Sequence, residues 1–323
     1  MSTTVEPPPG LTPPEDEPPA LQGGGGFGDW LFRTLAVVAG VLIMVALAAV
    51  FIFLGLEGIP GLTVGPDFYS GNPSFLSLVL RLLWGTTYVA VMSLLIAVPF
   101  ALGVALFISH YAPRWLATPV SYVIDLLAAV PSVVFGLWGA IALGSFIQPL
   151  HEWLHDVLGW LPFFSPTPSS NGQTMLTASI VLAVMILPII TSLCREIFAQ
   201  TPTLHQEAAL ALGATRWEMV RYAVFPYARS GMVSAIMLGL GRGLGETMAV
   251  SMVMGSAPVF TLAMIGTQNP RTIAAHIALN YKETTPNMVS VLIACGLVLF
   301  AFTFAVNALA RWIVGRSQRK LDA

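Results

Sequence analysis

Charged side chains are scarce in this sequence. Its 323 residues include 14 Lys and Arg and 16 Asp and Glu, which make up 9% of the chain and give a formal net charge of −2. Soluble domains carry about 25% charged residues, so an ordinary soluble protein is excluded. A nucleic-acid groove is excluded as well, because it needs clustered Lys and Arg. We therefore expect an integral membrane protein whose partner is the lipid bilayer.

Cysteine is equally rare. The only two cysteines, Cys194 and Cys295, both lie in apolar runs. Such cysteines are typical of small buried side chains, and they indicate neither a disulfide framework nor a metal pair. No metal and no cofactor is therefore expected in this chain.

The first 28 residues are nearly free of large apolar side chains and are rich in Pro and Gly. A segment of this kind cannot bury enough surface to offset its loss of entropy, so residues 1–30 are assigned to a disordered cytoplasmic tail. The tail is acidic and the apolar run behind it is too long for a signal peptide. A transmembrane domain over residues 31–323, with an uncleaved first span, is predicted.

Six apolar runs are long enough to cross a bilayer, which takes about 20 residues each. They cover residues 35–54, 84–108, 123–147, 175–194, 231–254 and 287–309. With the amino terminus in the cytoplasm, ten Lys and Arg fall inside and three, namely Arg81, Arg271 and Lys282, fall outside. Because positive residues favour the cytoplasmic side, we expect an all-α, multi-pass protein of the cytoplasmic membrane with both termini cytoplasmic.

The fourth and fifth spans are joined by a cytoplasmic loop, residues 195–229, with clear helix signals. Pro202 suits a helix start and Gly213 a helix end. Thr215 and Glu218 form a capping box that opens a second helix, which Pro226 is expected to close. A helix, a glycine turn and a second helix predict a docking surface for a soluble partner. An amphipathic connector on the membrane surface is the alternative.

The fifth span carries two ionisable residues near its centre, Arg242 and Glu246. Charges at this depth cost about 2.5–3.5 kcal/mol and usually mark a pathway or a relay. Their spacing of four residues predicts a pair on one helix face. The guanidinium would then suit a passing tetrahedral oxyanion, although the pair could instead be a buried structural bridge. Four glycines around the pair predict close approach of another helix backbone: Gly239, Gly241, Gly243 and Gly245.

The outer loop contains an H-E-x-x-H pattern formed by His151, Glu152 and His155. On a helix, two His at this spacing can bind zinc while the Glu acts as a general base. An intramembrane zinc protease is therefore an alternative class. No third zinc ligand is evident in the sequence, and the segment also fits an interfacial helix with Trp at headgroup level.

The cytoplasmic loop resembles a known motif. EAALALGATRWEMVRYAVFP is similar to the EAA loop in the membrane subunits of ABC importers. The resemblance implies a type I ABC importer fold and a coupling helix that docks on a dimeric ATPase subunit. It assigns that coupling to Glu207, Ala208, Ala209, Gly213 and Arg216. Neither Lys282 nor Lys320 has the Gly-Lys-Ser/Thr context of a P-loop, so ATP and Mg would be bound by the partner and this chain would not be an enzyme.

Two further segments narrow the resemblance. GLGRGLGETMAV and LAAVPSVVFGLWG are similar to signatures of phosphate-specific ABC importer permeases, and Met-Ala-Val after Thr247 resembles the PstC type. This implies a bacterial inner-membrane permease for inorganic phosphate that works by alternating access, with Arg242, Glu246 and Thr247 on the translocation pathway. A PstA-type sister subunit and an extracytoplasmic phosphate-binding protein are the implied partners. The PstA type itself, or a permease for sulfate or another oxyanion, remains an alternative.

Overall fold

The computed structural model describes the backbone of residues 27–254, 258–282 and 285–319. Within these ranges six helical stretches are long and apolar enough to cross a membrane. They are Phe27–Leu62, Phe75–Tyr111, Ser132–Leu158, Met175–Ala199, Arg216–Leu244 and Pro286–Trp312. The expected all-α membrane fold with six spans is therefore confirmed. The chain forms two compact units, residues 1–50 and 51–323.

The first helix, α1, covers Phe27–Gly58 and has Asp29 in its first turn, where a negative charge stabilises the helix dipole. Residues 27–30 are thus helical and do not belong to the tail that was expected over 1–30. The rest of that expected tail, residues 1–26, lies outside the described residues.

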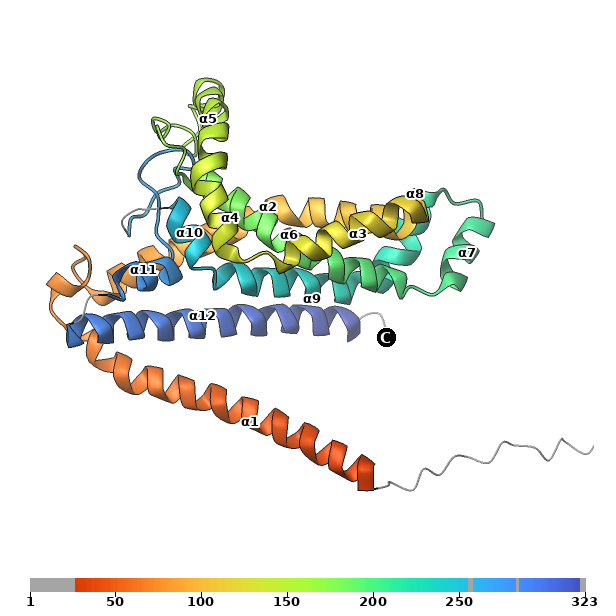
Figure 1. Ribbon diagram of the computed structural model, residues 1–323, viewed down its shortest axis with the longest axis horizontal. Helices are drawn as coiled ribbons and strands as arrows, with labels where there is room; N and C mark the ends of the chain where they lie inside the picture. Colours follow the sequence, from red (N-terminus) through yellow and green to blue (C-terminus); the bar gives the residue numbers. More distant parts are fainter. Residues whose placement is uncertain (1–26, 255–257, 283–284, 320–323) are drawn as a thin grey trace, which may run out of the picture. The chain divides into compact units, whose positions relative to one another are not determined.

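Three helices build the interior of the second unit: α2 (Phe75–Leu106), α6 (Met175–Ala199) and α9 (Phe225–Leu244). The helix α6 packs against both α2 and α9 and contributes many of the buried side chains (Figure 1). Fully buried alanines of α2, such as Ala101, allow α6 to come close, and Thr191 of α6 donates a hydrogen bond to the Ala101 carbonyl at 3.4 Å. Small residues at a helix interface favour this packing in a membrane.

The predicted third span, 123–147, is not one helix. The helix α3 covers Arg114–Ala129, and α4 begins only at Ser132 after an extended Val130 and Pro131. Proline disfavours the helical conformation of the residue before it, which explains the break. The third membrane helix instead runs on from α4 (Ser132–Trp138) through the π-helical turn Gly139–Leu143 into α5 (Gly144–Leu158).

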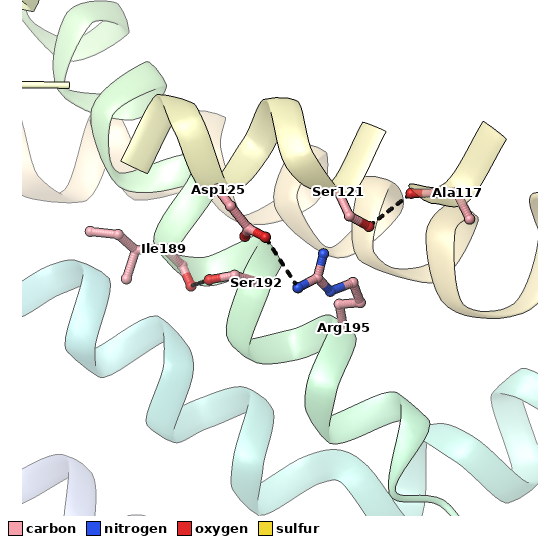
Figure 2. Close-up of polar contacts among 6 residues, drawn as sticks. All are labelled: Ala117, Ser121, Asp125, Ile189, Ser192 and Arg195. Carbon is pink, nitrogen blue, oxygen red and sulfur yellow. Dashed lines mark hydrogen bonds and ion pairs between the residues drawn. The ribbon is translucent and has the colours of Figure 1, made fainter. Parts of the chain in front are cut away.

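An ion pair ties α3 to α6. The Arg195 guanidinium lies 3.7 Å from the Asp125 carboxylate, and both side chains are partly exposed (Figure 2). Next to this pair, Ser121 and Ser192 donate hydrogen bonds to carbonyl groups of their own helices. A partly exposed ion pair contributes about 0–1 kcal/mol, so it orients α3 more than it stabilises it.

The predicted fifth span, 231–254, also has different bounds. One helical stretch combines α8 (Arg216–Met219), the π-helical turn Val220–Val224 and α9. Pro226 lies in the first turn of α9 and does not end a helix as expected, because the π-helical turn before it carries the backbone across. The stretch ends at Leu244. The remaining α-helices are α7 (Thr203–Ala211), α10 (Met248–Val253), α11 (Ile273–Asn280) and α12 (Pro286–Arg319), and two 3₁₀ helices cover Ile59–Leu62 and Pro66–Phe68.

Candidate translocation groove and coupling loop

The glycines of α9 face two different ways. A Cβ atom on Gly239 would lie 2.8 Å from Ile190 of α6, and one on Gly243 would lie 3.6 Å from Leu182. Gly239 therefore lets α9 pack closely on Ile190, whereas a Cβ atom at Gly243 would make only ordinary van der Waals contact. The close contact is with a side chain of α6, and not with another helix backbone as the sequence predicts. A Cβ atom on Gly241 would meet nothing within 4 Å, so this position faces open space.

The open face of α9 borders a groove. This groove has a volume of about 820 Å³, and its walls are formed by α9 and α12 together with Ile189 of α6. Its lining residues are Ile189, Val233, Ser234, Met237, Leu238, Gly241, Arg242, Asn307, Ala310, Arg311 and Gly315. The helices α9 and α12 lie side by side in this unit (Figure 1). Most of the lining is apolar, with a few polar groups that could fix the position of a solute, as in ligand pockets.

Arg242 lines this groove, but it does not pair with Glu246. Between these two described residues there is no ion pair, because α9 ends at Leu244 and Glu246 lies beyond it. The Glu246 carboxylate instead accepts a hydrogen bond from the Ala249 amide at 3.0 Å and is nearly buried. It thereby caps the first turn of α10, where the helix dipole favours a negative charge. The prediction of an Arg242–Glu246 pair is wrong, since such a pair needs a continuous helix.

Thr247 has a local role as well. Its hydroxyl donates a hydrogen bond to the Gly245 carbonyl at 3.1 Å, within the turn that joins α9 to α10. Neither Thr247 nor Glu246 lines the groove. Of the three residues that the resemblance placed on the pathway, the structure places Arg242 in the groove and the other two in the adjoining turn.

The two signature segments of the sequence meet in space. Gly136 of α4 faces α10 so closely that a Cβ atom there would lie 2.6 Å from the Ala249 Cα atom. A Cβ atom on Gly139 would meet Val181 of α6 and Val253 of α10. Any side chain at Gly136 would push the backbone of α10 aside. The turn that carries Glu246 and Thr247 is thus anchored, through α10, on the segment around Pro131.

The loop between α6 and α9 has the local structure that its sequence predicts. The helix α7 begins directly after Pro202, and Gly213 follows its end with a φ of +86°, a conformation that favours glycine. The capping box is complete: the Thr215 amide donates to Glu218 at 2.8 Å, and the Glu218 amide donates to the Thr215 hydroxyl at 3.3 Å. These local signals depend on neighbouring residues only, which explains why the sequence predicts them correctly.

The surface of this loop is open. Four of the five proposed coupling residues are exposed and Ala209 is half-buried. Two large apolar side chains next to them are also exposed, Leu204 at 73% and Leu212 at 90%. Apolar side chains left in solvent beside polar ones are typical of an interaction surface.

The two histidines of the H-E-x-x-H pattern contact different groups and do not face a common site. His151 is fully buried on α5 and lies 3.4 Å from the Thr174 hydroxyl, whereas His155 contacts the Phe164 carbonyl at 2.9 Å. The pattern thus lies on α5, within the helical stretch Ser132–Leu158, and not in a separate outer loop as the sequence predicts. In the part of the chain that the structure describes, no group of three or more His, Cys, Asp or Glu side chains could hold a metal ion.

Basic side chains also gather where α2 meets the segment before α12. Arg81 donates a hydrogen bond to the Pro258 carbonyl at 3.4 Å and lies over the Phe260 ring. Arg271 lies 3.5 Å from the His276 ring, and burial together with the positive charge of Arg271 lowers the pKa of His276 to about 4. His276 is therefore neutral at pH 7.

The family described as binding-protein-dependent transport system inner membrane component matches residues 97–319 of this chain. This match covers more than half of the chain, so the protein belongs to this family of inner-membrane transport subunits. The phosphate transport system permease protein PstC 2 of Mycobacterium tuberculosis is 44% identical over 303 residues, which cover 89% of this chain and 92% of the relative. PstC of Xylella fastidiosa is 40% identical over 307 residues, which cover 90% and 92%. Within the family, the chain is thus of the PstC type.

Solved structures show the same fold at low sequence identity. A bacterial ABC transporter involved in the import of the acidic polysaccharide alginate matches with a TM-score of 0.61 at 15% identity, over 89% of this chain and 96% of the other. The inward-facing MetNI methionine ABC transporter matches with a TM-score of 0.51 at 19% identity, over 73% and 96%. These matches establish the transmembrane fold of type I ABC importers.

Proposed function

We propose that this chain is the permease subunit through which an ATP-driven importer moves inorganic phosphate across the cytoplasmic membrane. The observation that carries this proposal is a groove with Arg242 in its wall, in a chain 44% identical to a permease named for phosphate transport. A guanidinium presents a planar fork of donors that matches the oxygen atoms of a tetrahedral oxyanion. A cation at this depth is costly unless water or an anion faces it.

The importer needs three further proteins. The exposed surface of α7, Gly213 and the start of α8 would dock on a dimeric ATPase, since no P-loop is present in the sequence and ATP hydrolysis must come from elsewhere. In this arrangement α7 and both termini would lie on the cytoplasmic side. A sister permease of the PstA type would complete the membrane domain, and an extracytoplasmic binding protein would deliver phosphate to the opposite side.

In this mechanism ATP-driven closure of the partner is passed through α7 to the helices of the bundle. The helical stretch from α8 through α9 is continuous, so a movement of the loop would shift Arg242 together with this stretch. Beyond Arg242 the stretch ends at Leu244, and the α10 segment is held separately by Glu246 and Gly136. Alternating access would then expose Arg242 first to one side of the membrane and then to the other.

The test is uptake of radiolabelled phosphate, with sulfate in parallel, in cells that lack this gene. Arg242→Gln should lower phosphate uptake about tenfold or more, because one charge-assisted interaction with the anion is lost. Arg229→Gln is the matched control, since Arg229 is exposed on the same helix but does not line the groove. Restoration of sulfate uptake instead of phosphate uptake by the wild-type gene would overturn the phosphate assignment.

A further inference from the structure

The groove contains a second arginine that the sequence patterns did not single out. We propose that Arg311 of α12 is a second anion-binding residue of the groove, so that phosphate passes between two guanidinium stations, Arg242 and Arg311. This inference rests on the proposed function, because it names further residues of the same pathway. The argument comes from the place of Arg311 in the groove, from the charges around it and from the neutral polar groups beside it.

Arg311 and Asn307 lie four residues apart on α12, which places both on the face that lines the groove. Across the groove α9 contributes Ser234 and Arg242. Arg242 is the lining residue of α9 nearest to the end of that helix at Leu244, whereas Arg311 lies between Asn307 and Gly315 among the lining residues of α12. Since α12 runs antiparallel to α9 (Figure 1), its first lining residue, Asn307, lies toward the end of the groove that carries Arg242, and Arg311 follows about one helical turn further along.

Nothing among the described residues neutralises this charge. No Asp or Glu lines the groove, and neither Arg242 nor Arg311 forms a hydrogen bond or an ion pair with a described residue. Elsewhere in the chain a basic side chain at the end of a span does find an acid, as Arg195 finds Asp125. A groove of one charge sign with low-dielectric walls concentrates counter-ions. The chemical class that it selects is therefore a small oxyanion.

The neutral polar groups of the groove differ in what they offer an anion. The Ser234 hydroxyl donates a hydrogen bond to the Ser230 carbonyl at 3.0 Å, within its own helix. The amide of Asn307 lies about one helical turn before Arg311 and could donate a hydrogen bond to an anion bound beside that guanidinium.

The first experiment measures uptake. Arg311→Gln should lower phosphate uptake about tenfold, and Arg311→Lys should keep more of it than Arg311→Gln, because Lys retains the charge and loses the fork. Arg229→Gln is again the control. If Arg242→Gln abolishes uptake while Arg311→Gln leaves it at the wild-type level, the second station is wrong and the proposed function stands. If neither variant changes uptake, the pathway of the proposed function is itself wrong.

The second experiment measures the electrostatic potential in the groove without measuring transport. Ser234→Cys, with Ala310→Cys as a second probe position, is treated in the assembled transporter with an anionic and a cationic methanethiosulfonate reagent. Each rate is divided by the rate of the same reagent with a free thiol. The native Cys194 and Cys295 are buried, so the background is low. The anionic reagent should react about tenfold faster after this correction, and Arg311→Gln should remove most of this preference. Equal rates, or a preference that survives Arg311→Gln, would overturn the proposal.

Discussion

The helices α6 and α9 are both membrane-spanning and they pack against each other, but they differ in almost every other respect. In the most apolar window of α6, 61% of the residues are buried, against 22% for the stretch that contains α9. Polar side chains of α6 are bonded within the protein: Ser179 donates to the Met175 carbonyl at 2.8 Å, and Thr191 donates to Ala101. Arg242 of α9 has no such partner among the described residues.

The difference in burial and in polar partners suggests that α6 supports the fold, whereas α9 presents a surface to a solute. A buried polar group without a partner destabilises a fold, so α6 satisfies its hydroxyl groups internally. The groove leaves its guanidinium groups available for a solute. Length and hydropathy identify both helices as spans, whereas the unpaired Arg242 side chain distinguishes the helix that lines the groove from the helix that supports it.

The largest expected effect comes from making the same substitution, Leu to Ala, once on α6 and once on α9. Leu182→Ala on α6 should lower the free energy of unfolding by about 3–4 kcal/mol, because Leu182 is fully buried and its removal leaves a cavity. Leu238→Ala on α9 should cost less than about 0.5 kcal/mol, because Leu238 is 57% exposed. Unfolding of the detergent-purified protein measures both values, and equal losses would break the comparison.

A second test lowers the pH until the buried His276 side chain becomes protonated. His276 is fully buried, and its pKa of about 4 lies below the usual 6.5, so the folded protein holds it neutral. Its contribution is complete above pH 6.5 and is lost as the pH falls toward 4, by up to about 3 kcal/mol in total. Unfolding measured between pH 7 and pH 4.5 should show this loss. His276→Leu should flatten the profile, and an unchanged profile would contradict the assignment.

The coupling loop provides a third and smaller effect. Gly213 has a positive φ but open space around it, so conformation and not crowding selects the glycine. Gly213→Val should cost about 1–2 kcal/mol locally and reduce uptake while the protein still inserts in the membrane. Gly213→Asn should keep most of the uptake, since Asn tolerates this conformation. Loss of uptake in both variants would indicate that the space around Gly213, filled by a partner, matters instead.

The smallest expected effect concerns the one ion pair that α6 forms among the described residues. Asp125→Asn should change the free energy of unfolding by less than about 1 kcal/mol, because both side chains are partly exposed. Arg195→Gln should have a similar effect, and the double variant should add little further loss. A loss as large as that of Leu182→Ala would show that α6 supports the fold through charge as much as through packing.

The sequence predicts best what neighbouring residues decide. Pro202, Gly213 and the Thr215–Glu218 capping box have the expected structure because each acts over three or four residues. The six apolar helices were also predicted, but two of their outlines were wrong. Span 123–147 breaks at Pro131, and span 231–254 breaks before Glu246, because an apolar run shows that a segment is in the membrane and not that it is one helix.

The groove could be predicted only in part. Arg242 was found from its depth in a span, and its expected pairing with Glu246 failed because the helix ends between the two residues. Asn307 and Arg311 were missed, although their spacing of four residues places them on one face of the sixth span. Their importance depends on which helix lies opposite, and that is decided by the packing of α12 on α9.

Three π-helical turns affect which way the side chains after them point: Phe107–Tyr111, Gly139–Leu143 and Val220–Val224. Each accommodates one residue more than an α-helical turn would hold. Deleting a single residue within 220–224 would therefore convert the π-helical turn into an α-helical one and leave the direction of Arg242 nearly unchanged. In the α-helical part of α9, by contrast, one residue corresponds to about 100° of rotation, so a deletion there, before Arg242, would turn Arg242 out of the groove. One-residue length differences should therefore be tolerated better in these turns than in the α-helices around them.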